Sequence, residues 1–289
     1  MTTKTLKGGM ASAALALALA LCGGASAEPV DDTLILNGEI EMITRAPAPE
    51  HLEGRLGPDV ISGWLYREDE TRDVQRDDFE NPASLMLEAA AVAWDTVEGS
   101  EGKACASCHE SVDSMAGVRP AMPKINATTG ELWSMEQYIN DCRVNRMGAE
   151  AWEWDKDPMK NMTALISSVS RGMPVNVQID GPAAPYWEQG KEIYYTRYGQ
   201  LELSCANCHE DNNGNHIRAD HLSQGQTNGF PVYRFNTSGL VSIHNRFRGC
   251  IRDTRAEPFA VGSPEATALE LYVASRGMGL SVESPSVRQ

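Results

Sequence analysis

The chain is poor in aromatic and basic residues for its length of 289 residues. Phe, Trp and Tyr together make up 7% of it, which is a lean supply of large apolar side chains for a core. Lys and Arg number 25 against 40 Asp and Glu, which gives a formal charge of −15. Such an excess of negative charge argues against binding to nucleic acid or to anionic membranes. It is compatible with a basic or locally complementary protein partner.

Long apolar runs are missing after the first few residues. The one such run, 10–21, is preceded by two lysines and followed by the small residues Ala25 and Ala27. This is the pattern of a cleaved secretory signal peptide, and the run is too short to cross a bilayer as an α-helix. Cys22 follows a leucine rather than a small residue, so lipid attachment is not expected. We therefore expect residues 1–27 to be removed and the exported protein to have no membrane anchor.

One pentapeptide, Cys-x-x-Cys-His, occurs twice, 100 residues apart. The copies are Cys105-Ala-Ser-Cys108-His109 and Cys205-Ala-Asn-Cys208-His209. Such a motif attaches haem c: its two thiols form thioethers with the haem, and its histidine is an axial iron ligand. A zinc half-site or a redox dithiol is the other interpretation, but zinc more often shows further spaced ligands and a dithiol needs no histidine. We predict two covalently bound haem c groups. They would supply much of the missing apolar core, and their attachment outside the cytoplasm fits a bacterial periplasm.

The two halves of the chain repeat one another around these motifs. Pro123 and Pro231 each precede a further cysteine by 19 residues, Cys142 and Cys250 respectively. A Leu-x-Ser triplet ends eight residues before each of these cysteines, and Thr-Ala-Leu followed by Arg-Gly-Met recurs beyond them. Self-similarity at a long period indicates a repeated unit. We predict an all-α fold with two tandem class I cytochrome c-like domains related by duplication.

Helix signals set the predicted domain limits. Asn81-Pro82 is a helix start, with Asn as N-cap and Pro in the first turn. The predicted helices are 83–97, 161–171, 185–198 and 265–276, and few strand signals are present. The predicted segments are an N-terminal extension that packs on the first domain (28–80), a first cytochrome domain (81–177) and a second one (178–289).

Each haem iron has a second axial position, and the repeat limits the choice of ligand. Methionine is a common ligand there, but the second half has none over 174–277. The candidates in the second half are His216, His221, His244 and Cys250. The candidates in the first half are Met115, Met122, Met135, Met147 and Cys142. If both halves use the same position, only cysteine satisfies both, which points to His109/Cys142 and His209/Cys250 ligation. A disulfide between Cys142 and Cys250 is the alternative, because these two cysteines are left over in an oxidising compartment.

The surroundings of these two cysteines differ. The arginines near Cys250 are Arg246, Arg248, Arg252 and Arg255. The first half has Tyr138 at the position of Arg246. Arginine binds small oxyanions and raises the thiolate fraction of a nearby thiol. These arginines could instead pair with haem propionates, although for Arg246 the one-sided difference favours a substrate. We interpret His244 as a surface histidine rather than a proton carrier, and place His216 and His221 in a polar loop away from iron.

Both haem motifs, Cys142 and the segment Arg246-Phe247-Arg248-Gly249-Cys250 together resemble the SoxA family over nearly the whole mature chain. SoxA proteins are the dihaem subunits of the SoxAX cytochromes of periplasmic thiosulfate oxidation. The resemblance implies an L-cysteine S-thiosulfotransferase that joins thiosulfate oxidatively to a cysteine of the carrier SoxYZ. SoxX, a monohaem cytochrome, would be the heterodimer partner that receives the electrons.

The resemblance also implies roles for residues. Cys250, as a thiolate or persulfide, would be the catalytic sulfur and the distal ligand of the second haem, and Arg246 would bind substrate. Some family members have lost the first haem, but this chain keeps its motif and Cys142, so two haems are expected. The alternative is a dihaem electron carrier without sulfur-transfer chemistry, in which both cysteines only tune the haem potential. That alternative does not explain why arginines gather at one cysteine.

Overall fold

The computed structural model describes residues 1–2 and 31–289. Residues 32–289 form one compact unit. The expected signal peptide, apart from its first two residues, lies outside the described part. Within the described part, no helix is long and apolar enough to cross a membrane.

The N-terminal extension contains short strand pairs and one helix, although few strands were expected. Its elements are β1 (Leu34–Leu36), β2 (Ile40–Met42), β3 (Arg45–Pro47), η1 (Glu50–Leu52), β4 (Asp59–Ile61), η2 (Gly63–Tyr66) and α1 (Asp69–Arg76). β1 and β2 pair antiparallel around Asn37-Gly38, whose positive φ angles of 54° and 71° suit a tight hairpin turn. The inward side chains of this hairpin pack on Trp64, which is fully buried.

The extension packs against both halves of the chain, and not on the expected first domain alone. The carboxylate of Glu283 in the second half is buried and accepts hydrogen bonds from Ser62 Oγ at 2.5 Å and Gln75 Nε2 at 3.1 Å. A buried carboxylate needs such donors, and the extension supplies them. Contacts with the first half include an ion pair between Asp78 and Arg171 at 2.6 Å and the packing of Val74 against Ala164.

The first half is built on α-helices around a methionine-rich core. Its elements are α2 (Ser84–Asp95), α3 (Ala106–His109), η3 (Val112–Met115), η4 (Arg119–Ala121), β5 (Lys124–Ile125), β6 (Leu132–Trp133), α4 (Met135–Asp141), the π-helical turn η5 (Cys142–Arg146) and α5 (Asp157–Ser168). The Asn81 side chain accepts a hydrogen bond from Ala83 N at 3.0 Å in the turn before α2, whose N-cap residue is Ala83 rather than the expected Asn81. α2 and α5 pack together and bury Trp94, Met159 and Met162.

The second half follows the same order of elements. They are η6 (Gly181–Ala183), α6 (Ala184–Tyr195), α7 (Cys205–His209), β7 (His216–Ile217), β8 (Asp220–His221), β9 (Val232–Arg234), β10 (Gly239–Val241), α8 (Ile243–Asp253), α9 (Pro264–Arg276) and β11 (Ser286–Arg288). α6 and α9 approach closely at Gly190, where a Cβ would lie 2.0 Å from Ala268 O. In each half the order is long helix, haem-motif helix, strand pair, cysteine helix and closing helix.

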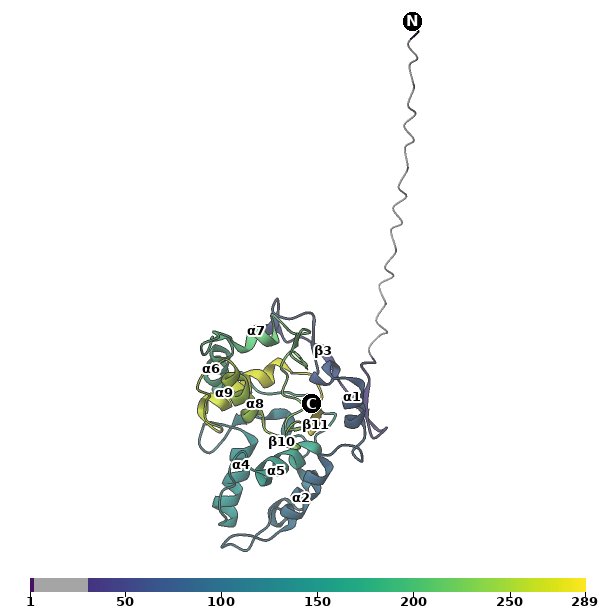
Figure 1. Ribbon diagram of the computed structural model, residues 1–289. Coiled ribbons are helices and arrows are strands. Elements are labelled where there is room, and N and C mark those ends of the chain that lie inside the picture. The colour runs from purple at the N-terminus through teal and green to yellow at the C-terminus, as the bar shows by residue number, and fades with distance from the viewer. Residues whose placement is uncertain (3–30) are drawn as a thin grey trace. The chain divides into compact units, whose positions relative to one another are not determined.

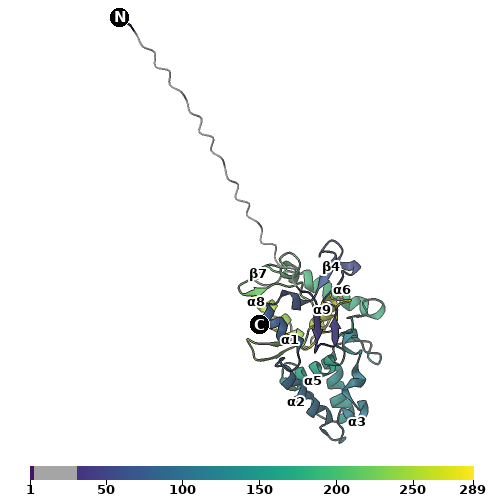
Figure 2. The same cartoon turned by 90° about the vertical axis from the view of Figure 1, so that its right-hand side faces the viewer.

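The two helix groups lie at opposite ends of the compact unit. α2, α4 and α5 lie together at one end and α6, α8 and α9 at the other, with the C-terminus between them (Figures 1 and 2). β11 pairs in parallel with β9, and β9 in turn pairs antiparallel with β10. This small sheet joins the end of the chain to the strand pair that precedes the second cysteine helix.

Candidate functional site

The second haem motif forms a helix with its histidine held in a defined orientation. Ser204 caps α7 and Cys205, Cys208 and His209 lie on this short helix. His209 Nδ1 lies 2.8 Å from the backbone carbonyl of Ser223. Burial lowers the pKa of His209 to about 4, so at neutral pH its ring is neutral and Nδ1 donates to that carbonyl. This bond leaves the Nε2 lone pair free, which is the arrangement that metal-ligating histidines show.

A glycine is required beside this histidine. Gly225 has a φ of +79°, and a Cβ there would lie 2.8 Å from His209 Cγ. The backbone that carries the Ser223 carbonyl can therefore approach the imidazole ring only without a side chain at position 225.

The first haem motif is arranged in a similar way. Cys105 caps α3, and His109 ends that helix. The ring of Trp94 on α2 lies 5.9 Å from the His109 ring, and Trp94 Nε1 donates to Glu110 O at 3.1 Å. The motif thus packs on the helix that was expected to precede it.

The two remaining cysteines lie beside their own haem motifs. Burial raises the pKa of Cys205 to about 12 and also raises that of Cys208, and in both cases the charge of Cys250 raises it further. In the first half, burial raises the pKa of Cys105, and the charge of Cys142 adds to this effect. Electrostatic effects of this kind fall with distance, so each cysteine is a neighbour of its motif.

No disulfide joins any two cysteines of residues 31–289, so Cys142 and Cys250 are not joined to one another. These two cysteines lie in different types of helix. Cys142 opens the π-helical turn η5, whereas Cys250 lies within the regular helix α8. The disulfide alternative therefore has no support in the structure.

Arg246 lies one helical turn before Cys250, on the same face of α8. The charge of Cys250 is the largest influence on Arg246 and raises the pKa of this guanidinium. Burial has the largest effect on the pKa of Cys208 and on that of His209. The charge of Arg246 also acts on both groups and lowers their pKa values. The structure thus brings together the predicted substrate arginine, the predicted catalytic cysteine and the second haem motif.

The other arginines on this helix and just after it have separate partners or face solvent. Arg248 forms an ion pair with Asp155 at 3.0 Å. Arg255 donates to Gln200 Oε1 at 3.4 Å, and Arg252 is exposed.

His244 is not a surface residue, so that interpretation is wrong. It is 1% exposed, its Nε2 lies 3.0 Å from Glu270 Oε2, and its ring stacks on Trp154 at 5.2 Å. Gly262 N donates to Nδ1 at 3.0 Å, so the neutral ring carries its proton on Nε2 and donates it to Glu270. Glu270 also pairs with Arg119 of the first half at 3.5 Å. The cluster therefore joins the two halves.

His216 and His221 lie on the β7–β8 hairpin, where their rings stack 4.4 Å apart. His221 Nε2 bonds to Gly214 O at 2.9 Å. This agrees with their expected place in a polar loop.

The second motif fits a haem in a further respect. Arg276 is fully buried, and one of its nitrogens pairs with Glu210 at 2.5 Å. Its Nε and Nη2 are buried and have no hydrogen-bond partner among the described residues. The charge of Arg276 also lowers the pKa of Cys205 and His209, so this side chain lies near the motif. Two such donors suit the carboxylate of a haem propionate.

Zinc is a poorer fit than haem. In the described part of the chain, no three His, Cys, Asp or Glu side chains converge as a zinc ion requires. Haem iron needs only one or two protein ligands besides the macrocycle.

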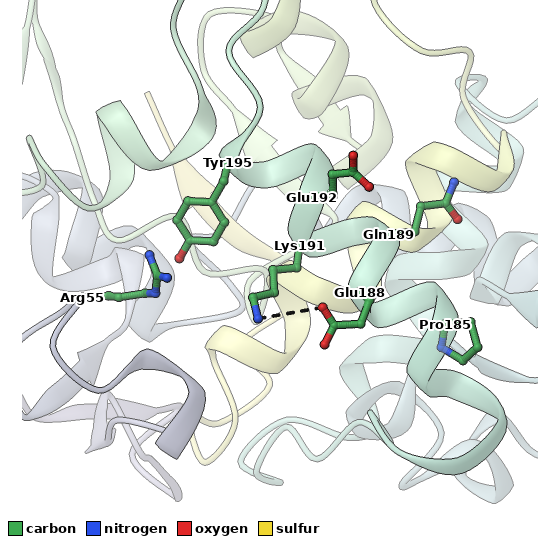
Figure 3. A pocket seen from close by; sticks show the side chains of 7 residues that line it. All are labelled: Arg55, Pro185, Glu188, Gln189, Lys191, Glu192 and Tyr195. Atoms are coloured by element: carbon green, nitrogen blue, oxygen red, sulfur yellow. Dashed lines mark ion pairs between the residues drawn. The ribbon is translucent and has the colours of Figure 1, made fainter.

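One surface cavity lies away from these cysteines. It has a volume of about 640 Å³ and is lined by residues of α6 together with Arg55 (Figure 3). Lys191 and Glu188 pair across its wall, and Tyr195 faces Arg55 (Figure 3). No cysteine lines this cavity, so it is not the site of sulfur chemistry.

Helices around two Cys-x-x-Cys-His motifs, each with a second cysteine beside it, define a c-type cytochrome. The family model described as "SoxA/TsdA, cytochrome c domain" matches residues 89–175 and 189–282. The L-cysteine S-thiosulfotransferase subunit SoxA of Paracoccus pantotrophus is 57% identical over 99% of this chain and 98% of its own length. The subunit of the same name from Rhodovulum sulfidophilum is 57% identical over 99% of both chains.

A solved structure agrees with these sequences. A chain in the crystal structure of SoxXA from P. pantotrophus is 56% identical, with a TM-score of 0.88 over 91% of this chain and 100% of the other. The chain therefore belongs to the SoxA subunits of the SoxA/TsdA cytochrome c family.

Proposed function

We propose that this protein is the dihaem subunit of a periplasmic L-cysteine S-thiosulfotransferase. It would join thiosulfate to a cysteine of the carrier SoxYZ and act as a heterodimer with SoxX. The observation that carries the proposal is the place of Arg246 and Cys250, one helical turn apart beside the second haem motif. The names of relatives 52–57% identical to the chain support the same activity.

Two haem c groups are proposed, one for each motif. The first would be attached by Cys105 and Cys108 with His109 and Cys142 as axial ligands. The second would be attached by Cys205 and Cys208 with His209 and Cys250 as axial ligands. The two separate matches to one domain model and the shared order of elements support two tandem domains related by duplication.

The overall reaction joins the outer sulfur of thiosulfate to the carrier's cysteine sulfur. A carrier thiol and thiosulfate form a new sulfur–sulfur bond, and one proton and two electrons are released. Haem bound at the second motif would supply the exit for these electrons towards the haem of SoxX. Cys250, as a thiolate or persulfide, would hold the sulfur under transfer.

Arg246 would have the task of binding the anion. Thiosulfate carries two negative charges, and the sulfur of Cys250 repels them when it is negatively charged. A guanidinium that lies beside this sulfur offsets the repulsion and can bond to the oxygens of the sulfonate end.

The test is to incubate the holoprotein in complex with SoxX, together with SoxYZ and thiosulfate, and to measure the mass of the carrier. The expected product is a thiosulfonate adduct on the carrier cysteine. Cys250→Ser should abolish it, while Cys142→Ser, the matched change in the first half, should leave it in place. Reduction of SoxX without any adduct on the carrier would favour the dihaem electron carrier instead.

A further inference from the structure

Two further arginines lie near Arg246, and neither is on the cysteine helix. Arg234 ends strand β9, and Arg67 follows η2 in the N-terminal extension. Burial lowers the pKa of both guanidinium groups, and the charge of Arg246 lowers each further. The charge of Cys250 acts in the opposite direction on Arg234. The four groups therefore share one neighbourhood, although they lie up to 183 positions apart in the sequence.

The fold fixes both side chains in this place. Arg67 Nη2 donates to His221 O of the β7–β8 hairpin at 2.5 Å. Arg234 stands next to Arg288 in the parallel register of β9 and β11. Arg288 Nη2 lies 3.2 Å from the position that a Cβ on Gly63 would take, so η2 is packed against β11. The extension is thereby held against the sheet that carries Arg234.

These partly buried arginines lack the carboxylate partners that the buried arginines have, although Arg234 Nε donates to Asn236 Oδ1 at 3.3 Å. In the part of the chain that the structure describes, Arg143 and Arg276 pair with glutamates at 2.7 and 2.5 Å. No carboxylate lies within ion-pair distance of Arg67, Arg234 or Arg246 in that same part. Arg67 Nε is moreover buried without any hydrogen-bond partner there. A buried donor such as Arg67 Nε is costly to leave unpaired, and an anion would satisfy it.

The three arginines share one carboxylate neighbour. Asp220 acts on all three and raises the pKa of each, while Glu68 acts on Arg67 alone and Asp253 on Arg246 alone. These positive groups lie together in a chain whose formal charge is −15. Positive charge placed locally on an acidic protein concentrates anions at that point.

We propose that Arg67 and Arg234 bind substrate together with Arg246, as a three-arginine site for the divalent anion of thiosulfate beside Cys250. The identity of the anion rests on the proposed function, whereas the anion site itself does not. The N-terminal extension would then be part of the active site, because it supplies Arg67.

The test uses the holoprotein in complex with SoxX and two charge-removing variants, Arg67→Gln and Arg234→Gln. Arg55→Gln is the matched control, since Arg55 belongs to the same extension but lies over the Tyr195 ring. Thiosulfate binding is measured by calorimetry without SoxYZ, and KM and kcat are measured with it. Visible spectra and thermal unfolding verify that haem and fold are intact.

Each test variant should weaken thiosulfate binding and raise KM by about 10- to 100-fold, the range for losing one charge-assisted hydrogen bond. Arg67→Lys should recover part of this loss by keeping the charge, and Arg55→Gln should match the wild type. Unchanged binding and KM in both test variants, with normal turnover in the wild type, would overturn the three-arginine site and leave the proposed function standing. Weakened binding in the variants of a protein that transfers no sulfur would support the anion site and refute the proposed function.

Discussion

The replacement Arg246→Ala tests most directly how the site handles its anion. Arg246 lies beside the sulfur of Cys250. Its loss removes the positive charge that offsets the repulsion between this sulfur and the thiosulfate anion. A hydrogen bond to a charged group contributes about 1.5–3 kcal/mol. At about 1.4 kcal/mol per tenfold change, this corresponds to a rise in KM of roughly 10- to 150-fold. Arg246→Lys should lose less, because it keeps the charge but not the planar fork.

The assay is steady-state thiosulfate oxidation by the holoprotein in complex with SoxX, with SoxYZ present. Arg248→Ala is the control on the same helix, because Arg248 pairs with Asp155 rather than with the cysteine. Its KM should match that of the wild type. Visible spectra of both variants should show two intact haems, so that a rise in KM reports binding. A KM for Arg246→Ala within twofold of the wild type would refute the role given to this arginine.

Three further predictions concern stability and haem binding. Gly225→Ala should disturb the second haem spectrum and cost about 1–2 kcal/mol of stability from its positive φ alone, because its Cβ would meet the His209 ring; an unchanged spectrum would contradict this. Gly190→Ala should lower the free energy of unfolding by about 3 kcal/mol, measured in denaturant, since its Cβ cannot fit against α9. Burial and the charge of Glu270 raise the pKa of Glu136, so the folded protein keeps a proton that the unfolded chain loses above about pH 4.3. Stability should therefore fall as pH rises from there, and Glu136→Gln should flatten this fall in melting curves between pH 5 and 7; an unchanged slope would count against it.

The repeated motifs could be predicted from the sequence because each acts through neighbours close in the chain. The Leu-x-Ser triplets are an example. Ser134 and Ser242 prove to be the N-caps of α4 and α8, so each begins the helix that leads to its cysteine eight residues later. An N-cap and the helix that follows it depend on residues close in the sequence, so the repeated pattern was enough to predict them.

The residues that could not be predicted depend on contacts far apart in the chain. His244 is buried against Glu270 and Trp154, and neither partner can be predicted from the residues around His244 in the sequence. Arg67 reaches the cysteine site only because the extension packs on the C-terminal segment. The hairpin turn at Asn37-Gly38 is different, since this dipeptide is a strong local signal for the β1–β2 pair.

The two halves share one plan but differ in how their charges are arranged, and this difference explains why one cysteine suits an anion. In the first half Arg143 pairs with Glu98 at 2.7 Å and lies over the Trp152 ring, so its charge is already matched. Burial and then the charge of Asp141 raise the pKa of Cys142, while the charge of Arg146 lowers it, so charges of both signs act on this cysteine.

In the second half the corresponding helix carries Arg246, which has no ion pair within the described residues and faces Cys250. Under the proposed function, a duplicated ligand position would account for two haems, and the unpaired positive charge would account for chemistry at only one of them. If this reasoning is right, moving an arginine to position 138 would not make the first half active. Tyr138→Arg would add one charge, but Asp141 and the paired Arg143 would still leave Cys142 without the surplus that an anion needs.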